Sequence, residues 1–418
     1  MKPISFSIEK KLNGPAGQTL GRAGTITTPH GTIQTPAFIV VGTKATVKAL
    51  SPEQVADLGA QAVLANTYHL YLEPGERIVK AAGGLHQFMN WNKPTFTDSG
   101  GFQAFSLGVA FGKTISKLSS GEPENFNADG VAYPTRSADG IPLAKITEDG
   151  VAFKSYRDGS EHFFTPEKSI EIQNDIGADI IFAFDECTSP TADKQYQKEA
   201  MDRTHRWAER SLARHKELAN PIALFGIVQG GRFEDLRKES ADIIGQMKVG
   251  DREFDGFGIG GSFDKEDIGT AVSWVNAVLP EGKPRHLLGI GEPEDFFLAI
   301  ENGCDTFDCV APTRIARNGT LYTKHGKIHI ENTKYREDFG PIEKDCACYT
   351  CQHYSVAYIG YLSRTKELLS HTLASIHNLH FIVHLVADIR QSIIDDRFYE
   401  FKEKFLGDYR LAEKSKER

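Results

Sequence analysis

The chain has 418 residues, of which 40% are hydrophobic and 25% are charged, values typical of a globular enzyme. The N-terminus lacks the apolar core of a signal peptide, and no run approaches about 18 apolar residues, which argues against a secreted or membrane protein and favours the cytoplasm. The formal net charge of −8 argues against bulk attraction to nucleic acid but is compatible with a local basic face.

The first predicted element is a β-hairpin at residues 22–36, where threonine and isoleucine alternate around Pro29-His30-Gly31. Beyond it, eight short apolar runs alternate with helical patterns, which predicts a (β/α)8 TIM barrel. A doubly wound sheet is disfavoured because no glycine-rich first turn is present. The predicted strands are residues 37–41, 62–65, 95–97, 179–184, 222–228, 254–259, 286–290 and 306–310, and the predicted helices include 52–58, 75–88, 166–176, 194–218, 233–247, 265–278 and 293–302.

One segment interrupts the barrel pattern. Residues 109–144 are rich in Gly, Ser, Pro and Asp and have no sustained period, which is typical of a lid or a flexible insertion, and we interpret them as an insertion. We therefore expect a hairpin region at residues 1–36 and a catalytic barrel at 37–340 that contains the insertion. Residues 341–418 contain three crowded cysteines, Cys346, Cys348 and Cys351, and we expect them to form a zinc-binding helical subdomain.

Carboxylates, an amide or backbone-exposing glycines follow five of the predicted strands, at the end where this class of barrel builds its active site. A single aspartate in such a place is more often a helix cap or a loop anchor, but three at this register favour a site. The residues are Asp98 after the third strand, Asp185 after the fourth, Gln229 after the fifth, Gly260 and Gly261 after the sixth, and Asp308 at the eighth.

These side chains suit chemistry at the anomeric carbon of a sugar. One carboxylate can attack the carbon while another manages the proton of the leaving group, and configuration is retained when the two lie about 5 Å apart. A third carboxylate, an amide and glycine backbone groups can read the edge of a purine. Phe102, directly after Gly100-Gly101, could stack on such a base.

The stretch Cys304–Gly319, CDTFDCVAPTRIARNG, combines a buried aspartate with two arginines. A charged group at the end of a buried strand is costly, so it usually has a function. One hypothesis is that Asp308 is a nucleophile and that Arg314 and Arg317 hold an anionic polymer over it. The alternative is a buried Asp–Arg pair that closes a loop.

A second motif predicts a metal site. Cys346, Cys348 and Cys351 are crowded together, which in a reducing compartment favours a metal, and His377 completes a closed tetrahedral set of the kind that holds structural zinc. His380 is a rival fourth ligand. We expect a helix at residues 355–369 and a second helix that opens at His377.

The motifs TDSGGFQ, FDEC, VQGG, FDCVAPTR-x-x-RNG and CxCxxC…H occur in the order and spacing of the bacterial tRNA-guanine transglycosylases, which the chain resembles over nearly its whole length. The resemblance implies that Asp308 is the nucleophile that captures the ribose and that Asp98 is the general acid/base. It also implies a base pocket and an RNA-binding surface. The implied base pocket comprises Asp98, Phe102, Asp185, Gln229, Gly260, Gly261 and Leu288, and the implied RNA contacts are Thr313, Arg314 and Arg317.

The resemblance also implies the reaction. The wobble guanine of the tRNA anticodon loop is expelled by Asp308, and a 7-deazaguanine base takes over the ribose. One structural Zn²⁺ per subunit and a homodimer are implied as well. Two rival functions are a retaining N-glycoside hydrolase or nucleosidase, which would not need the two arginines and the zinc appendage, and a non-catalytic tRNA-binding subunit of a heterodimer, which would not need all three aspartates.

The sequence departs from the family pattern in two places. Where bacterial members usually have GGLAVGE, this chain has Gly260-Gly261-Ser262-Phe263-Asp264-Lys265-Glu266. The incoming base can therefore be 7-aminomethyl-7-deazaguanine, whose cation Asp264 would favour, or preformed queuine. The insertion at 109–144 has no counterpart in typical members and could contact tRNA or a partner subunit.

Overall fold

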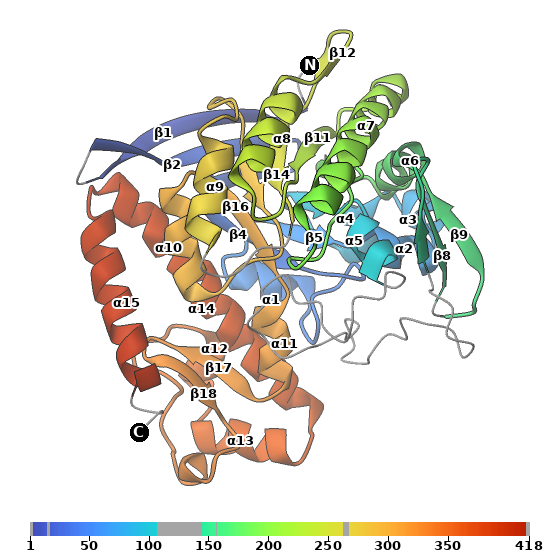
Figure 1. The fold of residues 1–418 in the computed structure, drawn as a ribbon. Coiled ribbons are helices and arrows are strands. Elements are labelled where there is room, and N and C mark those ends of the chain that lie inside the picture. The colour runs from blue at the N-terminus through green and yellow to red at the C-terminus, as the bar shows by residue number, and fades with distance from the viewer. Residues whose placement is uncertain (1–2, 15–16, 107–143, 156, 262–266, 415–418) are drawn as a thin grey trace.

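The computed structural model describes residues 3–14, 17–106, 144–155, 157–261 and 267–414, and a closed barrel of eight parallel strands forms its centre (Figure 1). Each strand pairs with the next in the chain, and the last pairs with the first, with Asp308 opposite Ile39. The predicted (β/α)8 barrel and its eight strands are confirmed, with ends that differ from the predicted ones by at most three residues. The strands are β4 (Ala37–Val41), β5 (Val63–Ala65), β6 (Thr95–Thr97), β10 (Ile180–Phe182), β11 (Ala223–Val228), β14 (Gly256–Ile259), β15 (Arg285–Leu287) and β16 (Thr306–Cys309).

The barrel interior is filled by apolar side chains, as this fold requires. Ile39, Phe96, Phe182 and Phe225 are at most 3% exposed and belong to one cluster. Ile26 and Ile33 of the N-terminal sheet join the same cluster. The sheet therefore closes the N-terminal end of the barrel, which leaves the C-terminal end for the site.

The N-terminal sheet has three antiparallel strands, β1 (Ser5–Gly14), β2 (Gly17–Thr28) and β3 (Gly31–Thr35). The predicted hairpin is confirmed as β2 and β3, whereas β1 was not expected. Its turn residue His30 donates through Nδ1 to Asp179 (2.7 Å), which His86 also contacts (3.1 Å). The centroids of the two imidazole rings lie 3.6 Å apart, in a stacked arrangement. Together with the short distances from the ring nitrogens to the carboxylate, this indicates that hydrogen bonds, rather than a metal ion, join His30 and His86 to Asp179.

Helices surround the barrel. The helices predicted at 166–176 and 194–218 have the predicted bounds. Each start is fixed by the residue before it, because the side chains of Thr165 and Asp193 accept a hydrogen bond from the third N–H of the helix. The predicted helix at 75–88 is wrong, since Gly83 and Gly84 have φ of 94° and 88° and divide it into α3 and α4. These helices are α1 (Pro52–Asp57), α2 (Thr67–Leu72), α3 (Glu76–Ala81), α4 (Leu85–Met89), α5 (Gly101–Ser106), α6 (Pro166–Ile176), α7 (Lys194–Leu218), α8 (Glu234–Gln246), α9 (Ile268–Asn276), α10 (Pro293–Glu301) and α11 (Ala311–Arg317).

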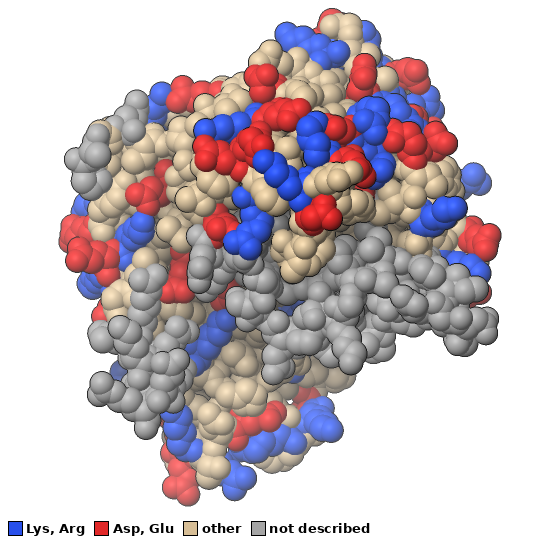
Figure 2. All heavy atoms as spheres, viewed as in Figure 1, with Lys and Arg blue, Asp and Glu red and all other residues tan. Residues whose placement is uncertain are grey.

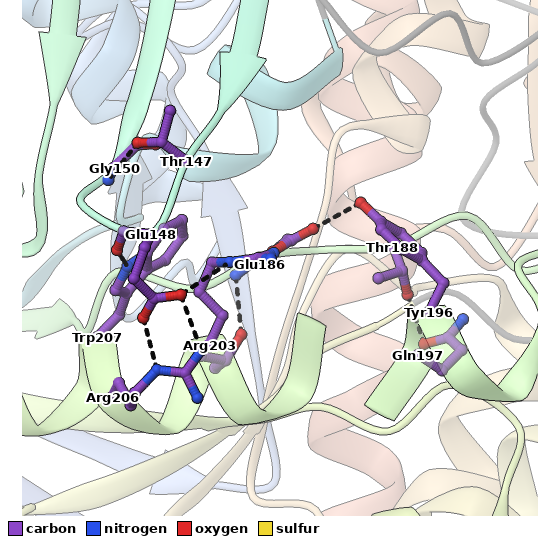
Figure 3. Close-up of polar contacts among 11 residues, drawn as sticks. Thr147, Glu148, Gly150, Glu186, Thr188, Tyr196, Gln197, Arg203, Arg206 and Trp207 are labelled. Carbon is purple, nitrogen blue, oxygen red and sulfur yellow. Dashed lines mark hydrogen bonds and ion pairs between the residues drawn. The ribbon is translucent and has the colours of Figure 1, made fainter. Parts of the chain in front are cut away.

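A small antiparallel sheet, β7 (Ala144–Ile146), β8 (Val151–Lys154) and β9 (Glu161–Phe164), was not expected from the sequence. The predicted insertion at 109–144 lies outside the described residues except for Ala144, which begins β7. A polar network joins this sheet to α7 (Figure 3): Glu148 in the β7–β8 turn pairs with Arg206, and its carbonyl accepts from Trp207 (2.7 Å).

The same network reaches the FDEC segment. Arg203 of α7 pairs with the buried Glu186, and the Tyr196 hydroxyl donates to the other carboxylate oxygen at 2.7 Å (Figure 3). Burial and the neighbouring Glu186 raise the pKa of Tyr196, so its hydroxyl keeps the donated proton. The network therefore holds the segment that carries Asp185.

The C-terminal part lies beside the barrel and below it in Figure 1, and α14 runs from it along the barrel. Among the described helices, α14 alone is long and apolar enough to cross a membrane by composition, but 61% of that window is buried inside the structure. His377 lies inside α14 and does not open a helix as predicted, because the apolar pattern begins at Leu368. The remaining elements are β12 (Lys248–Val249), β13 (Arg252–Glu253), β17 (Thr320–Thr323), β18 (Gly326–His329), the 3₁₀ helix η2 (Thr333–Tyr335), α12 (Tyr349–His353), α13 (Val356–Arg364), α14 (Leu368–Ile394) and α15 (Phe398–Lys414).

Candidate active site

Asp308 stands at the C-terminal end of β16, where its side chain is 14% exposed. Its Oδ1 atom accepts hydrogen bonds from the Gly289 amide (2.9 Å) and from Nε2 of His286 (3.1 Å). Both donors come from β15 and the loop that follows it. The carboxylate is thus oriented by the neighbouring strand, and sequence reasoning did not find His286.

Asp98 follows β6 and is held by the loop after β5. Oδ1 accepts from the backbone amides of Thr67 (2.9 Å) and Gly100 (3.2 Å), and Oδ2 accepts from the amide group of Asn66. Gly100 has φ of 75°, and a Cβ atom there would lie 3.2 Å from the Tyr68 amide nitrogen. A glycine at position 100 therefore has a steric reason, and its backbone amide is a donor to Asp98.

Asp185 and Gln229 form one hydrogen-bonded unit with Ser99. The Ser99 hydroxyl donates to Oδ1 of Asp185 (3.1 Å), and the Gln229 amide donates to Oδ2 (2.7 Å). This bond fixes the amide orientation, so Oε1 of Gln229 lies near Gly261, where an added Cβ atom would come within 3.0 Å. The predicted pocket residues of β10, β11 and β14 are thus brought into contact with one another.

Arg237 of α8 holds the two glycine turns of this unit together. It is completely buried, and it donates to the carbonyls of Gly231 and Gly260, both at 2.7 Å. Burial lowers the pKa of Arg237 to about 10. This role could not be predicted from the sequence, because Arg237 lies in an ordinary amphipathic helix.

The other predicted pocket residues lie in the same region. Leu288 directly precedes Gly289 and packs on the apolar barrel interior, and Phe102 is half-buried in α5. Residues 262–266, on which the choice of incoming base was expected to depend, lie outside the described residues.

A cluster of cations lies at the same barrel end, between the loop after β4 and α11. Burial and the positive charges of Arg317 and Lys44 lower the pKa of Lys48 to about 8. Burial and both lysines lower the pKa of His69 to about 4. Burial and Arg314 lower the pKa of Arg317. We call Lys44, Lys48, Arg314 and Arg317 the cationic cluster.

Over α7 and α8, Figure 2 shows positive and negative side chains intermixed. There, Lys194 pairs with Asp235 at 2.6 Å and Lys198 with Glu239 at 3.2 Å. The cationic cluster lies instead at the active-site end of the barrel, where a group of cations is suited to bind an anionic ligand. Thr313, a predicted RNA contact, is only 7% exposed, and its hydroxyl donates to the Val310 carbonyl (3.3 Å).

The predicted metal ligands come together in the C-terminal part. Nδ1 of His377 lies 3.9, 3.6 and 3.4 Å from the Sγ atoms of Cys346, Cys348 and Cys351, and all four residues are buried. Tetrahedral zinc bonds of usual length require a separation of about 3.6 Å between sulfur and nitrogen. His380, the rival ligand, lies 3.8 Å from Cys346. The Cys346–Cys348–Cys351–His377 cluster can therefore hold a metal ion.

The metal cluster is tied to the barrel through α14. Nε2 of His377 contacts the Tyr322 carbonyl at 2.7 Å, which leaves Nδ1 for a metal. The next residue, Asn378, is completely buried and donates to the carbonyls of Pro312 and Thr320, both at 3.0 Å. Pro312 belongs to α11, so the metal cluster and the cationic cluster share one support.

Comparisons with known proteins agree with this geometry. The family model described as queuine tRNA-ribosyltransferase matches residues 17–129 and 129–411. The chain is 47% identical to the queuine tRNA-ribosyltransferase of Desulforamulus reducens over 97% of this chain and 98% of the relative. It is 46% identical to that of Thermoanaerobacter pseudethanolicus, over 99% and 100%, and 44% identical to that of Fusobacterium nucleatum, over 97% and 98%. The chain therefore belongs to the queuine tRNA-ribosyltransferase family, whose members are pentosyl-transferring enzymes.

Proposed function

We propose that this enzyme exchanges the wobble guanine of a tRNA anticodon for a 7-deazaguanine base through a covalent bond between Asp308 and the ribose. One observation carries the proposal. An oriented carboxylate at the end of β16 and the hydrogen-bonded Asp185–Gln229 unit both lie at the C-terminal end of the barrel. A family role in queuosine modification of tRNA supports it.

The reaction follows as two displacements at C1′ of the ribose. Asp308 attacks C1′, and the bond from C1′ to N9 of guanine breaks, so that guanine leaves with the electron pair and takes up a proton. N9 of the incoming base then attacks C1′ and loses its proton, and the bond to Asp308 breaks to restore the carboxylate. Asp98 is held by three N–H donors, and we assign it the role of general acid and base.

The base pocket can accept both bases because guanine and a 7-deazaguanine share the same pairing edge. That edge carries N–H donors, which suit the Asp185 carboxylate, and a carbonyl acceptor, which suits backbone and amide N–H groups. Arg237 keeps the Gly260–Gly261 turn in place for such contacts. Because residues 262–266 depart from the family pattern in sequence, both 7-aminomethyl-7-deazaguanine and queuine are candidate substrates.

A base-exchange assay tests the function. The enzyme, unmodified tRNA and radiolabelled guanine are incubated, and label is expected to enter tRNA without net loss of base. Net release of guanine without incorporation would instead identify a hydrolase, and neither event would identify a non-catalytic RNA-binding subunit. Unlabelled 7-aminomethyl-7-deazaguanine and queuine, added in parallel, are compared by the rate at which each expels the label.

The cationic cluster supports binding of the RNA backbone by Arg314, Arg317 and Thr313, with Lys48 as an added member. Lys48→Ala is expected to weaken binding of an anticodon stem-loop RNA and to reduce the salt dependence by about one phosphate contact. Fluorescence titration at several salt concentrations measures both. Lys238→Ala, which removes an exposed lysine of α8 that pairs with Glu234 (2.5 Å), is the matched control and should leave both unchanged.

The same lysine predicts a pH dependence. Phosphate binds the charged form of Lys48, whose pKa is about 8, so affinity is full below this pKa and falls as the pH rises through it. Between pH 7 and 9 the wild type should therefore lose affinity that Lys48→Arg retains, because arginine stays charged. If the affinities of the two proteins changed with pH in the same way, Lys48 would not belong to the RNA-binding surface.

We further propose a cytoplasmic homodimer with one structural zinc per subunit. Exposed aromatic side chains on the C-terminal part support a second copy as the partner: Tyr349, Tyr358 and Tyr361 are 40–54% exposed, and Leu368 nearby in the chain is 78% exposed. Light scattering of the purified enzyme measures the mass, and a monomer at micromolar concentration would contradict this state.

A further inference from the structure

His286 lies inside the barrel directly against the predicted nucleophile. It belongs to β15, it is completely buried, and its ring lies 5.7 Å from the ring of Phe96 and 5.2 Å from that of Phe182. Apolar side chains fill most of this interior, so a histidine here needs polar partners to offset the cost of burial.

Both ring nitrogens have such partners. Nδ1 lies 2.9 Å from the Thr306 hydroxyl, and Nε2 lies 3.1 Å from Oδ1 of Asp308. An ionised carboxylate only accepts hydrogen bonds, so Nε2 must carry the proton. The hydroxyl of Thr306 can donate to Nδ1, which fixes this tautomer.

We propose that His286 is a positioning residue for Asp308, one that orients the carboxylate and stabilises its charge each time the ribose is released. The inference rests on the proposed role of Asp308 as the nucleophile. Together with the Gly289 amide, Nε2–H places two donors on one carboxylate oxygen. These donors hold the carboxylate in one orientation, which favours attack on C1′.

The two donors matter most in the second displacement. While Asp308 is bonded to C1′ its carboxyl group is a neutral ester, and its negative charge returns when N9 of the incoming base displaces it. A hydrogen bond to the charged carboxylate is stronger than one to the ester, so it lowers the barrier for release of the ribose. Loss of the donor is therefore expected to slow discharge of the covalent intermediate.

Two substitutions separate this role from packing. His286→Gln keeps an N–H donor near the position of Nε2, whereas His286→Leu removes it and suits the surrounding phenylalanine rings. The covalent enzyme–tRNA adduct is formed, excess guanine is added, and samples are quenched in denaturant over time. The Leu variant should discharge the adduct at least about tenfold more slowly than wild type, as expected for a lost hydrogen bond to a charged group, and the Gln variant should lie between them. The KM for tRNA should change little in either.

A role in packing alone predicts the opposite order, because leucine fits the apolar site better than glutamine. A Leu variant that discharges the adduct as fast as wild type, or faster than the Gln variant, would overturn the inference. His215→Leu is the matched control, since His215 is also buried but contacts the Ile222 carbonyl (3.0 Å) at the opposite end of the barrel. If the wild type forms no adduct, the proposed function fails, whereas a wild-type adduct that the Leu variant discharges normally refutes only the role of His286.

Discussion

Asp308→Asn is expected to abolish the denaturant-resistant adduct between enzyme and tRNA and to lower base exchange by several orders of magnitude, as loss of a covalent nucleophile does in other enzymes. The asparagine carbonyl can still accept from His286 and Gly289, so the local structure should survive. Denaturing gel electrophoresis of enzyme with tRNA detects the adduct, and the rate of guanine incorporation measures the activity.

Two companion measurements make this result specific. The thermal midpoint of Asp308→Asn should equal that of the wild type, because a neutral side chain of the same shape replaces the aspartate. Asp98→Asn should slow exchange but still form some adduct, because Asp98 moves a proton and does not bond to the ribose. If the adduct persisted in Asp308→Asn and disappeared in Asp98→Asn, Asp98 would be the nucleophile and Asp308 the proton carrier.

The sequence was sufficient for the barrel and for the candidate carboxylates, because both depend on local pattern. Each barrel strand is a short apolar run, and the residue just after such a run must lie at the active-site end. Asp98, Asp185 and Asp308 could be selected on this ground alone. Their catalytic and binding roles stay predictions.

Other features depend on distant parts of the chain and could not be predicted. His286 is the first residue of the predicted strand at 286–290, where a polar residue is unremarkable, and only closure of the barrel brings its ring against Asp308. The lowered pKa of Lys48 results from burial and from the nearby charge of Arg317, which lies in α11, hundreds of residues later in the chain. The error at residues 75–88 was local, since a helical period continues across Gly83-Gly84 although both glycines have positive φ.

A large loss of stability is also expected when the metal cluster is disrupted. Cys348→Ala should lower the zinc content below one per subunit and destabilise the C-terminal helices, because a structural zinc site of this kind can contribute roughly 10 kcal/mol to local folding. Metal analysis by mass spectrometry measures the first effect, and circular dichroism during heating measures the second. Cys304→Ala, at a buried cysteine outside the cluster, is the matched control and should keep its zinc.

The identity of the fourth ligand is tested in the same way. His377→Ala should lose zinc, whereas His380→Ala should keep it, because the imidazole of His377 approaches all three thiols and is held by the Tyr322 carbonyl at 2.7 Å. Retention of zinc in His377→Ala together with loss in His380→Ala would transfer the ligand role to His380. Unchanged metal content in Cys348→Ala would refute the zinc site.

Loss of zinc should also weaken RNA binding, although the metal cluster contributes no group to the reaction. Asn378, next to His377, bonds to the Pro312 carbonyl at the start of α11, and α11 carries Arg314 and Arg317. Disorder at His377 would therefore reach the cationic cluster through a single turn of α14. Cys348→Ala is expected to raise the KM for tRNA more than it lowers kcat, and an equal fall of kcat with unchanged KM would contradict this coupling.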